Sequence, residues 1–284
     1  MSLVVDAPGV YLDVPDDVYH SDTGAVSSTG LRKLLPPSTP AHFRHYIDHG
    51  QAPKAAYDLG HAVHREILGE GADIAVPSDG DDVPFEEWRT KEAKAEVARI
   101  RAAGQVPVKA DAMDRVRAMT TAVREHETAG PLMDRGRVPD AQAELSMWWQ
   151  DPGTGVWCRS RFDLLTRDAD GRLIGVDVKS TDDASPYAFA KSVGSYRYDQ
   201  QAAHYLAGCA VLDPGTPVGF VFVAVEKEPP YGVGLYELRD DDLAAAHERN
   251  GRALRVYAEC VASGVWPSYS VEVEPLDLPR WVTA

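Results

Sequence analysis

The chain has 284 residues, of which 44% are hydrophobic, so it is long enough to bury a sizeable core in one large domain or two small ones. Its net charge of −15 argues against a protein that coats nucleic acid non-specifically, because neutralising phosphates requires Lys and Arg. The sequence contains no run of eighteen apolar residues and no basic-then-apolar N-terminal segment, so we expect neither a membrane span nor a secretory signal.

The first half of the chain is predicted to be mainly helical. Residues 8–26 look extended and turn-rich, and the Ser-Ser-Thr run that follows caps a short helix ending at Pro36. Hydrophobic spacing and Pro or Gly boundaries then predict four more helices, over residues 40–49, 54–68, 84–103 and 109–128.

The second half is predicted to contain most of the strands. These cover residues 141–150, 155–166, 172–180, 217–226 and 231–238. Helices interrupt and follow the strands at residues 185–193, 198–212 and 240–263. This order indicates an α/β fold with a central mixed β-sheet flanked by helices. We predict one domain over residues 1–284, with a helical portion (1–130), a sheet core (141–238), and a final helix and tail (239–284).

The three cysteines, Cys158, Cys209 and Cys260, are widely dispersed and show no metal-ligand spacing. We expect reduced, mostly buried thiols, as in a cytoplasmic protein.

Asp163 and, fourteen residues later, Asp177-Val178-Lys179 are the most informative features of the sequence. Both segments look like short apolar strands joined by a reversing turn, so two carboxylates and a lysine would emerge at neighbouring strand ends. Carboxylate oxygens suit Mg²⁺ or Mn²⁺, and a lysine beside the metal can orient or deprotonate an attacking water. This set fits metal-assisted phosphodiester hydrolysis, although a surface hairpin with an ion pair would show the same spacing.

Four further residues are candidates for the same site. His64 lies on the helix over residues 54–68, and Glu144 lies on the strand before the Asp163 strand, on the face of Ser146 and Trp148. Each also has a simpler interpretation, as a hydrogen-bonded histidine or a solvent-facing glutamate. The other two, Gln201 and Tyr205, are four residues apart, so they share a helix face and could hold a phosphate or a base.

Basic residues lie near the expected cleft. Arginine can grip phosphate in a bidentate manner, although each of these residues could equally be an ordinary surface charge. On its strand, Arg161 is expected to face the same way as Arg159 and Asp163. The candidate arginines are Arg32, Arg44, Arg159, Arg161 and Arg197.

Taken together, these segments resemble the RecE-type exonucleases, also called exonuclease VIII, in the RecB-like branch of the PD-(D/E)xK nuclease superfamily. The resemblance spans most of the chain and rests on the order and combination of short motifs. They occupy residues 19–22, 27–31, 40–43, 58–64, 143–146 with Trp149 and Asp151, 161–163, 177–180, 201–205, 266–269 and 278–281.

The resemblance implies a role for each candidate. The metal ligands would be His64, Glu144, Asp163, Asp177 and the Val178 carbonyl. They would hold Mg²⁺, with Mn²⁺ as an alternative, as two ions about 4 Å apart. Lys179 would position the water or stabilise developing charge, while Gln201 and Tyr205 would contact the strand or order the catalytic groups. The DNA-binding residues would be Ser28, Arg32, Arg44, Arg159, Arg161 and Arg197.

The resemblance also implies an activity. Such nucleases, often encoded by phages or prophages, typically degrade one strand of duplex DNA from its 5′ end. They leave a 3′ overhang for a single-strand annealing protein that acts in recombination and repair. Double-stranded DNA ends, such an annealing protein and further copies of the chain are the expected partners, with no membrane involved. Superfamily members with an iron–sulfur cluster use four cysteines, so three dispersed cysteines predict no cluster.

Three other functions remain open from the sequence. One is a structure-specific endonuclease or flap nuclease that uses the same site, which closed circular DNA would distinguish from an exonuclease. A second is a DNA-end-binding protein that has lost cleavage, although the Asp163, Asp177 and Lys179 set argues against it. The third is a metal-dependent hydrolase of small phosphoesters.

Overall fold

The computed structural model describes residues 5–50, 55–138, 140–270 and 272–278. A six-stranded sheet forms its centre, in the order β1-β4-β5-β6-β7-β8. These strands are β1 (Gly9–Tyr11), β4 (Gln142–Gln150), β5 (Trp157–Arg167), β6 (Leu173–Thr181), β7 (Val218–Glu226) and β8 (Val233–Tyr236). β6 and β7 run parallel, and the other neighbouring strands are antiparallel. The predicted fold class, a mixed sheet flanked by helices, is confirmed.

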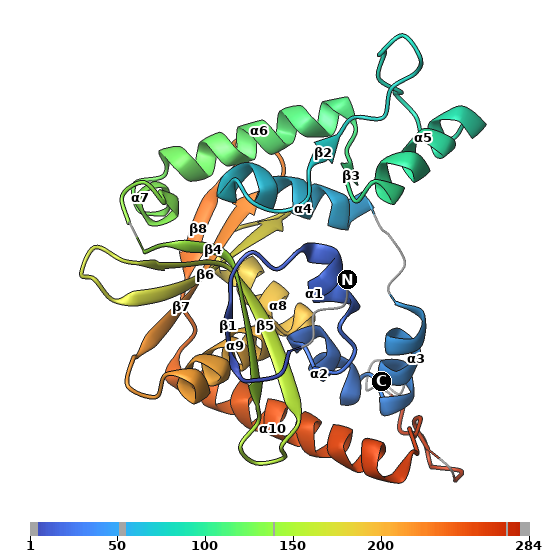
Figure 1. Ribbon diagram of the computed structural model, residues 1–284, viewed down its shortest axis with the longest axis vertical. Helices are drawn as coiled ribbons and strands as arrows, with labels where there is room; N and C mark the ends of the chain where they lie inside the picture. Colours follow the sequence, from blue (N-terminus) through green and yellow to red (C-terminus); the bar gives the residue numbers. More distant parts are fainter. Residues whose placement is uncertain (1–4, 51–54, 139, 271, 279–284) are drawn as a thin grey trace.

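Helices cover both faces of this sheet, and Figure 1 shows the two layers above and below it. One layer contains α4 (Ala55–Leu68), α6 (Ala110–Glu125) and α7 (Ala129–Met133). The other contains α2 (Ser28–Leu34), α3 (Pro40–His49), α8 (Pro186–Tyr196), α9 (Tyr198–Leu212) and α10 (Asp240–Ser263). α8 and α9 together connect the parallel strands β6 and β7, a connection that parallel pairing requires.

Alternating apolar side chains on the central strands explain why both faces are covered. On β6, Ile174, Val176 and Val178 are buried in the core beneath α4 and α6. On β7, Phe220 and Phe222 are buried in the opposite core, against α9. Each such side chain contributes roughly 1.5–3 kcal/mol when fully buried, so neither face of the sheet is stable without its helices.

The N-terminal segment forms a separate cover over β4. Tyr19, on α1 (Asp16–Ser21), packs edge-on against Trp148 with ring centroids 5.6 Å apart. The Trp148 indole donates to the Asp22 carboxylate at 2.8 Å. The sequence predicted only extended and turn-rich chain here, because the partners of β1 and α1 lie more than a hundred residues away.

Helix boundaries agree closely in some places and differ in others. The helices predicted over residues 40–49 and 240–263 have the bounds of α3 and α10. The helix predicted over 84–103 is wrong in its first part, since α5 (Lys91–Ala102) begins after the Thr90 cap, whose hydroxyl accepts from Ala93 N at 3.1 Å. α7 and the short parallel pair β2 (Ile74–Ala75) and β3 (Val106–Pro107) were not predicted.

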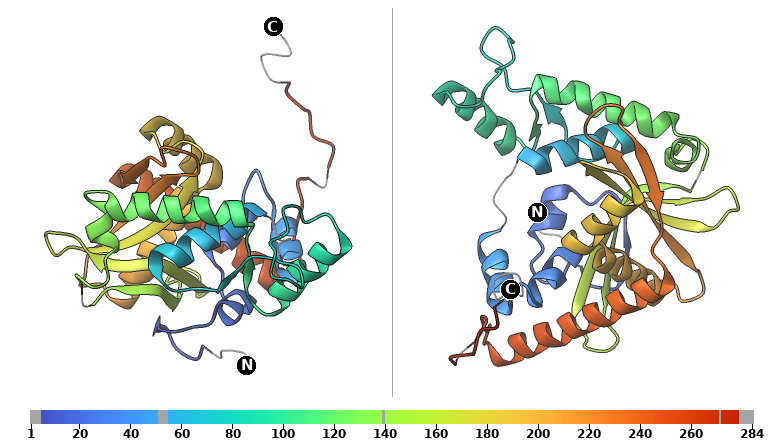
Figure 2. Two further views of the ribbon diagram at one scale, coloured as in Figure 1. Left: turned by 90° about the horizontal axis from the view of Figure 1, so that it is seen from above. Right: turned by 180° about the vertical axis from the view of Figure 1, so that it is seen from behind.

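The segment that follows α10 is anchored by Trp266. Trp266 stacks on Phe43 of α3, with centroids 5.5 Å apart, and anchors the segment that leaves α10. Beyond it the described chain is extended and exposed, as Figure 2 shows from above. The last three residues of the 278–281 motif and the predicted helix start at residue 54 lie outside the described residues.

No helix in the described ranges is long and apolar enough to cross a membrane. Cys158, Cys209 and Cys260 are free thiols, of which the first and last are buried. The cytoplasmic location and the division into domain portions stay predictions.

Candidate functional site

Asp163 and Asp177 lie where two central strands stop pairing. The ladder between β5 and β6 ends at Leu164 opposite Val176, so the next residues outward are Asp163 and Asp177. One oxygen of the Asp163 carboxylate accepts the Val178 backbone N–H at 2.7 Å and thereby replaces the missing ladder bond. The separated strand ends leave room for side chains, and the hairpin predicted from the sequence is confirmed.

Glu144 occupies the equivalent break between β4 and β5. The ladder pairs residues on either side of it, but Glu144 itself has a positive φ of 50°. Ala143 packs toward the α4 core, whereas Leu145, two residues later, belongs to the α9 core on the opposite face of the sheet. The regular alternation of side chains between the two faces thus breaks at Glu144. The regular face predicted for Glu144, Ser146 and Trp148 is therefore interrupted. A left-handed glutamate costs about 1–3 kcal/mol, a strain that often marks functional sites.

Lys179 forms an ion pair with the Asp177 carboxylate inside the site. The Asp177 side chain is almost fully buried, and the Lys179 ammonium lies 4.8 Å from the centre of the Tyr198 ring. Burial alone would lower the pKa of Lys179, but attraction to Asp177 and Asp163 outweighs it and raises the pKa. Lys179 is therefore a cation at neutral pH, suited to stabilising negative charge rather than removing a proton.

α9 supplies the groups that hold Asp177. The Gln201 amide donates to the Asp177 carboxylate at 2.5 Å and lies 3.4 Å from the Tyr205 hydroxyl. The predicted shared helix face of Gln201 and Tyr205 is thus confirmed. Burial raises the pKa of Tyr205 well above its usual range, so its hydroxyl stays neutral, and its ring packs edge-on against Phe162 at 5.1 Å.

His64 reaches the same point from α4, on the other side of the sheet. Its Nε2 atom lies 2.8 Å from the Val178 carbonyl oxygen and 3.6 Å from the Asp163 carboxylate. Imidazole, carboxylate and carbonyl therefore converge from α4, β5 and β6, and 114 residues separate His64 from Val178 in the sequence. The metal-ligand roles that the family resemblance implies for His64 and the Val178 carbonyl stay predictions.

The donor set fits a hard divalent cation. Carboxylate and carbonyl oxygens with one imidazole are ligands that Mg²⁺ or Mn²⁺ accepts. Among the described residues, however, no group of three or more His, Cys, Asp or Glu side chains is already arranged to hold a metal. Protein contacts account for this, since Lys179 holds Asp177 and His64 faces Val178. Binding would require those contacts to give way.

Arg159 and Arg161 are used by the protein itself. Both are buried, and Arg161 donates to the Asp16 carboxylate at 2.6 Å and lies over the Tyr19 ring at 4.1 Å. Arg159 donates to the Asp22 carbonyl. Their strand was expected to turn them toward DNA together with Asp163, but the N-terminal segment covers them. In this arrangement their donors are not available to phosphate.

The remaining predicted DNA contacts differ in accessibility. Ser28 is buried in the first turn of α2, and Arg44 pairs with Asp48 on α3. Arg32 donates to the Tyr196 carbonyl at the rim of the site, and Arg197 joins α8 to α9 in a left-handed conformation. Of the predicted set, Arg32 and Arg197 are thus positioned nearest to Lys179 and its Tyr198 neighbour.

Tyr198 is the residue that the sequence reasoning missed. Its ring supports the Lys179 ammonium, yet it was not among the candidates. The signal was present, because Tyr198, Gln201 and Tyr205 follow the i, i+3, i+7 spacing of one helix face.

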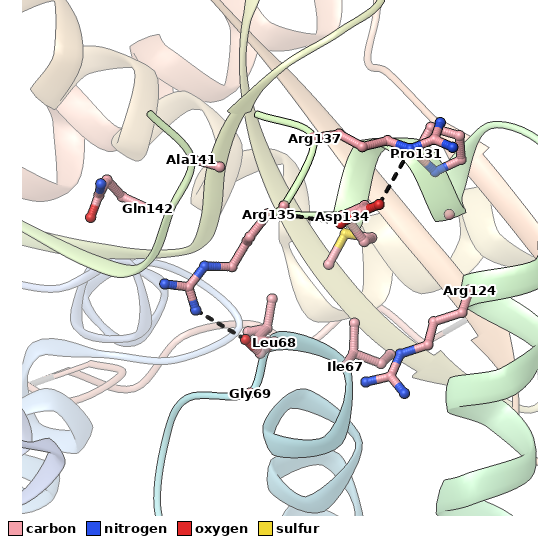
Figure 3. Close-up of a pocket in the computed structure, with 13 residues that line it drawn as sticks. Ile67, Leu68, Gly69, Arg124, Pro131, Asp134, Arg135, Arg137, Ala141 and Gln142 are labelled. Atoms are coloured by element: carbon pink, nitrogen blue, oxygen red, sulfur yellow. Dashed lines mark hydrogen bonds and ion pairs between the residues drawn. The ribbon is translucent and has the colours of Figure 1, made fainter. Parts of the chain in front are cut away.

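An open cavity of about 870 Å³ lies elsewhere, between the ends of α4 and α6 and the start of β4. Figure 3 shows its arginines, and Arg135 donates to the Leu68 carbonyl at 3.2 Å while Arg137 pairs with Asp134. None of the candidate catalytic or metal-binding residues lines it. Its size does not outweigh the convergence of chemical groups around Asp163.

Comparison with known proteins agrees with this geometry. Residues 27–279 match the family described as a PDDEXK-like domain of unknown function, DUF3799. The chain belongs to this family. The assignment of Asp177 and Lys179 as the acidic residue and lysine of the PDDEXK name stays a prediction. The predicted membership of the PD-(D/E)xK nuclease superfamily is confirmed, whereas the RecE type and a phage origin stay predictions.

One solved structure shares the fold of this chain. The crystal structure of a protein from Eubacterium rectale, described as "Putative exonuclease", aligns with a TM-score of 0.59 and 11% identity, covering 96% of this chain and 98% of that chain. The structure of SSO0001 aligns with a TM-score of 0.37 and 11% identity, over 85% of this chain and 77% of that chain, which is too distant to support an argument. No curated protein matches the chain.

Glu144 should make the metal-free protein less stable at high pH. Burial, and then repulsion from Asp163, raise its pKa from 4.5 to about 7, so its ionisation opposes folding as the pH rises through that window. We expect Glu144→Gln to match wild type at pH 4.5 and to exceed it by up to about 3 kcal/mol above pH 7.5. Thermal unfolding in EDTA across this range tests the expectation. Equal stability of the two proteins at high pH would contradict it.

Proposed function

We propose that the protein is a metal-dependent DNA exonuclease that hydrolyses phosphodiester bonds of linear duplex DNA from the 5′ end. The observation that carries this proposal is the convergence of Asp163, Asp177, Lys179, His64 and the Val178 carbonyl where the sheet opens. Membership of the PDDEXK-like family supports the reaction class. The description of the Eubacterium rectale protein supports an exonuclease in preference to an endonuclease.

The chain's own groups divide the work. Asp163, Asp177 and the Val178 carbonyl would hold Mg²⁺ or Mn²⁺, with His64 and Glu144 completing the shell. A bound divalent cation supplies charge stabilisation and a more acidic water to phosphodiester hydrolysis. Lys179, as a cation, places positive charge beside the scissile phosphate and stabilises the charge that develops there.

Two positioning contacts keep this arrangement in register. Gln201 holds one oxygen of Asp177 from α9, and the Val178 N–H holds one oxygen of Asp163 from β6. One oxygen of each carboxylate is thus held in place before any ligand arrives, while the Lys179 and His64 contacts would still have to give way to a metal. Such preorganisation lowers the free-energy cost of reorienting these groups during the reaction.

The biological setting follows from the direction of digestion. Removal of the 5′ strand would leave a 3′ overhang, which a single-strand annealing protein would take up in recombination or repair. Assembly of several copies around the duplex would retain it between successive cleavages. These partners are part of the proposal and rest on the family resemblance.

The test is digestion of linear duplex DNA labelled separately at its 5′ and 3′ ends, with closed circular DNA in parallel. We expect Mg²⁺-dependent release of nucleotides from 5′ ends, none in EDTA, and none from circles. Lys109→Ala is the matched control for Lys179→Ala, because Lys109 lies just before α6, outside the site, where it pairs with Glu87. Cleavage of closed circles would instead establish an endonuclease, and no hydrolysis with either Mg²⁺ or Mn²⁺ would refute the proposal.

A further inference from the structure

The two longest segments of this acidic chain without a carboxylate meet beside the site. Asp and Glu make up 44 of the 284 residues, yet residues 23–47 and 184–198 contain none. The first segment includes α2 and α3, and the second includes α8 and the first residue of α9. They meet where Arg32 of α2 donates to the Tyr196 carbonyl at the end of α8. The two segments therefore add no negative charge to the surface where they meet, which lowers the repulsion of a polyanion there.

A short aromatic stack leads from the site into this surface. The Lys179 ammonium lies 4.8 Å from the centre of the Tyr198 ring. The Tyr196 ring stacks on the Tyr198 ring, with centroids 5.6 Å apart and planes inclined by 27°. Tyr196 is 60% exposed. The Tyr196 ring therefore offers a flat apolar surface next to Tyr198, the ring that contacts Lys179.

Positive charge surrounds this exposed ring. Arg197 follows Tyr196 directly, and Arg32 fixes the Tyr196 backbone. Burial first, and then repulsion from Arg197 and Arg252, lower the pKa of Arg249 on α10. Arg197 and Arg252 thus lie close enough to Arg249 to act on its charge.

We propose that Tyr196 stacks on an unpaired base of the DNA strand that enters or leaves the site, while Arg32 and Arg197 contact the flanking phosphates. This inference rests on the proposed nuclease function and adds the form of the substrate. A base inside a duplex has both faces covered by its neighbours, so an exposed protein ring favours a strand whose bases are unpaired. Stacking is tolerant of sequence because every base has such a face.

The experiment measures binding of a fluorescent single-stranded oligonucleotide to the full chain in EDTA, by anisotropy. We expect Tyr196→Ala to weaken binding about tenfold and Tyr196→Phe to stay within about twofold of wild type. Tyr187→Ala is the matched control: Tyr187 is 74% exposed on the same helix, nine residues earlier and so on the opposite side. It should bind like wild type.

A second arm leaves the protein unchanged. The oligonucleotides carry a single abasic position, which is moved stepwise along the strand. At one position, the missing base should weaken binding to wild type by as much as Tyr196→Ala weakens binding to the intact strand. At that position the variant should lose nothing further.

Equal affinity of Tyr196→Ala and wild type, an equal loss in Tyr187→Ala, or no binding of single-stranded DNA would overturn the inference. Hydrolysis by a protein that fails these binding tests would leave the proposed function standing. Stacking without hydrolysis in Mg²⁺ or Mn²⁺ would refute the nuclease and retain the binding site.

Discussion

Lys179→Ala is expected to lower the rate of DNA hydrolysis by about 10² to 10³-fold, the loss typical when one preorganised electrostatic group is removed. The reason is that Lys179 is a cation held beside both carboxylates, so its removal takes away positive charge where the phosphate must react. The measurement is the single-turnover rate on end-labelled duplex DNA at saturating Mg²⁺. Single turnover separates the chemical step from product release.

The control for Lys179→Ala concerns folding, because the substitution leaves the buried Asp177 carboxylate without its ion-pair partner. Asp177→Asn keeps the shape of the side chain and its bond from Gln201, and it should also lose most activity. Circular dichroism and thermal unfolding of both variants should show a native fold. Unfolding of both would mean that this pair is structural, and the site assignment would fail.

Gly175→Ala is expected to destabilise the protein by about 3 kcal/mol, at the upper end of the usual cost of overpacking. A Cβ at Gly175 would lie 2.7 Å from the Cδ1 atom of Phe162, where real Cβ atoms are not found. Phe162 cannot move aside easily, since its ring is fully buried against Tyr205 and Phe220. The same displacement would shift Asp163, the next residue, so activity should also fall.

Urea unfolding measures this effect, with Gly194→Ala as the matched control. Gly194 lies within α8 with nothing close to the position of a new Cβ, so alanine there should stabilise the helix by up to about 1 kcal/mol. If Gly175→Ala were as stable as wild type, the contact between Phe162 and β6 would not constrain the site.

Local patterns predicted most of the fold. The strands from β4 to β7 and the helices α3, α9 and α10 follow runs of apolar residues bounded by Pro, Gly or Asp, so their existence could be derived from neighbouring residues alone. The elements that were missed depend on remote partners. β3 exists because it pairs with β2, about thirty residues earlier, and β1 because it pairs with β4.

The same distinction separates the site residues. Asp163, Asp177 and Lys179 lie on one hairpin, so sequence spacing could place them together. The burial of Arg161 could not be foreseen, because its ion-pair partner Asp16 lies 145 residues away and reaches it across β4. The positive φ of Glu144 has no sequence signature either, since glutamate does not favour the left-handed region.

His64 is the member of the site that comes from another layer. Residues 163–205 carry Asp163, Asp177, Lys179 and Gln201, whereas His64 belongs to a helix that is attached to the sheet by apolar packing and by the contact of His64 itself with Val178. A ligand that joins His64 to Asp163 would therefore tether α4 to β5. By mass action, such a ligand also opposes every local opening in which α4 leaves the sheet. Ligand binding at the site and packing of this helical layer on the sheet are thus thermodynamically coupled, so each stabilises the other.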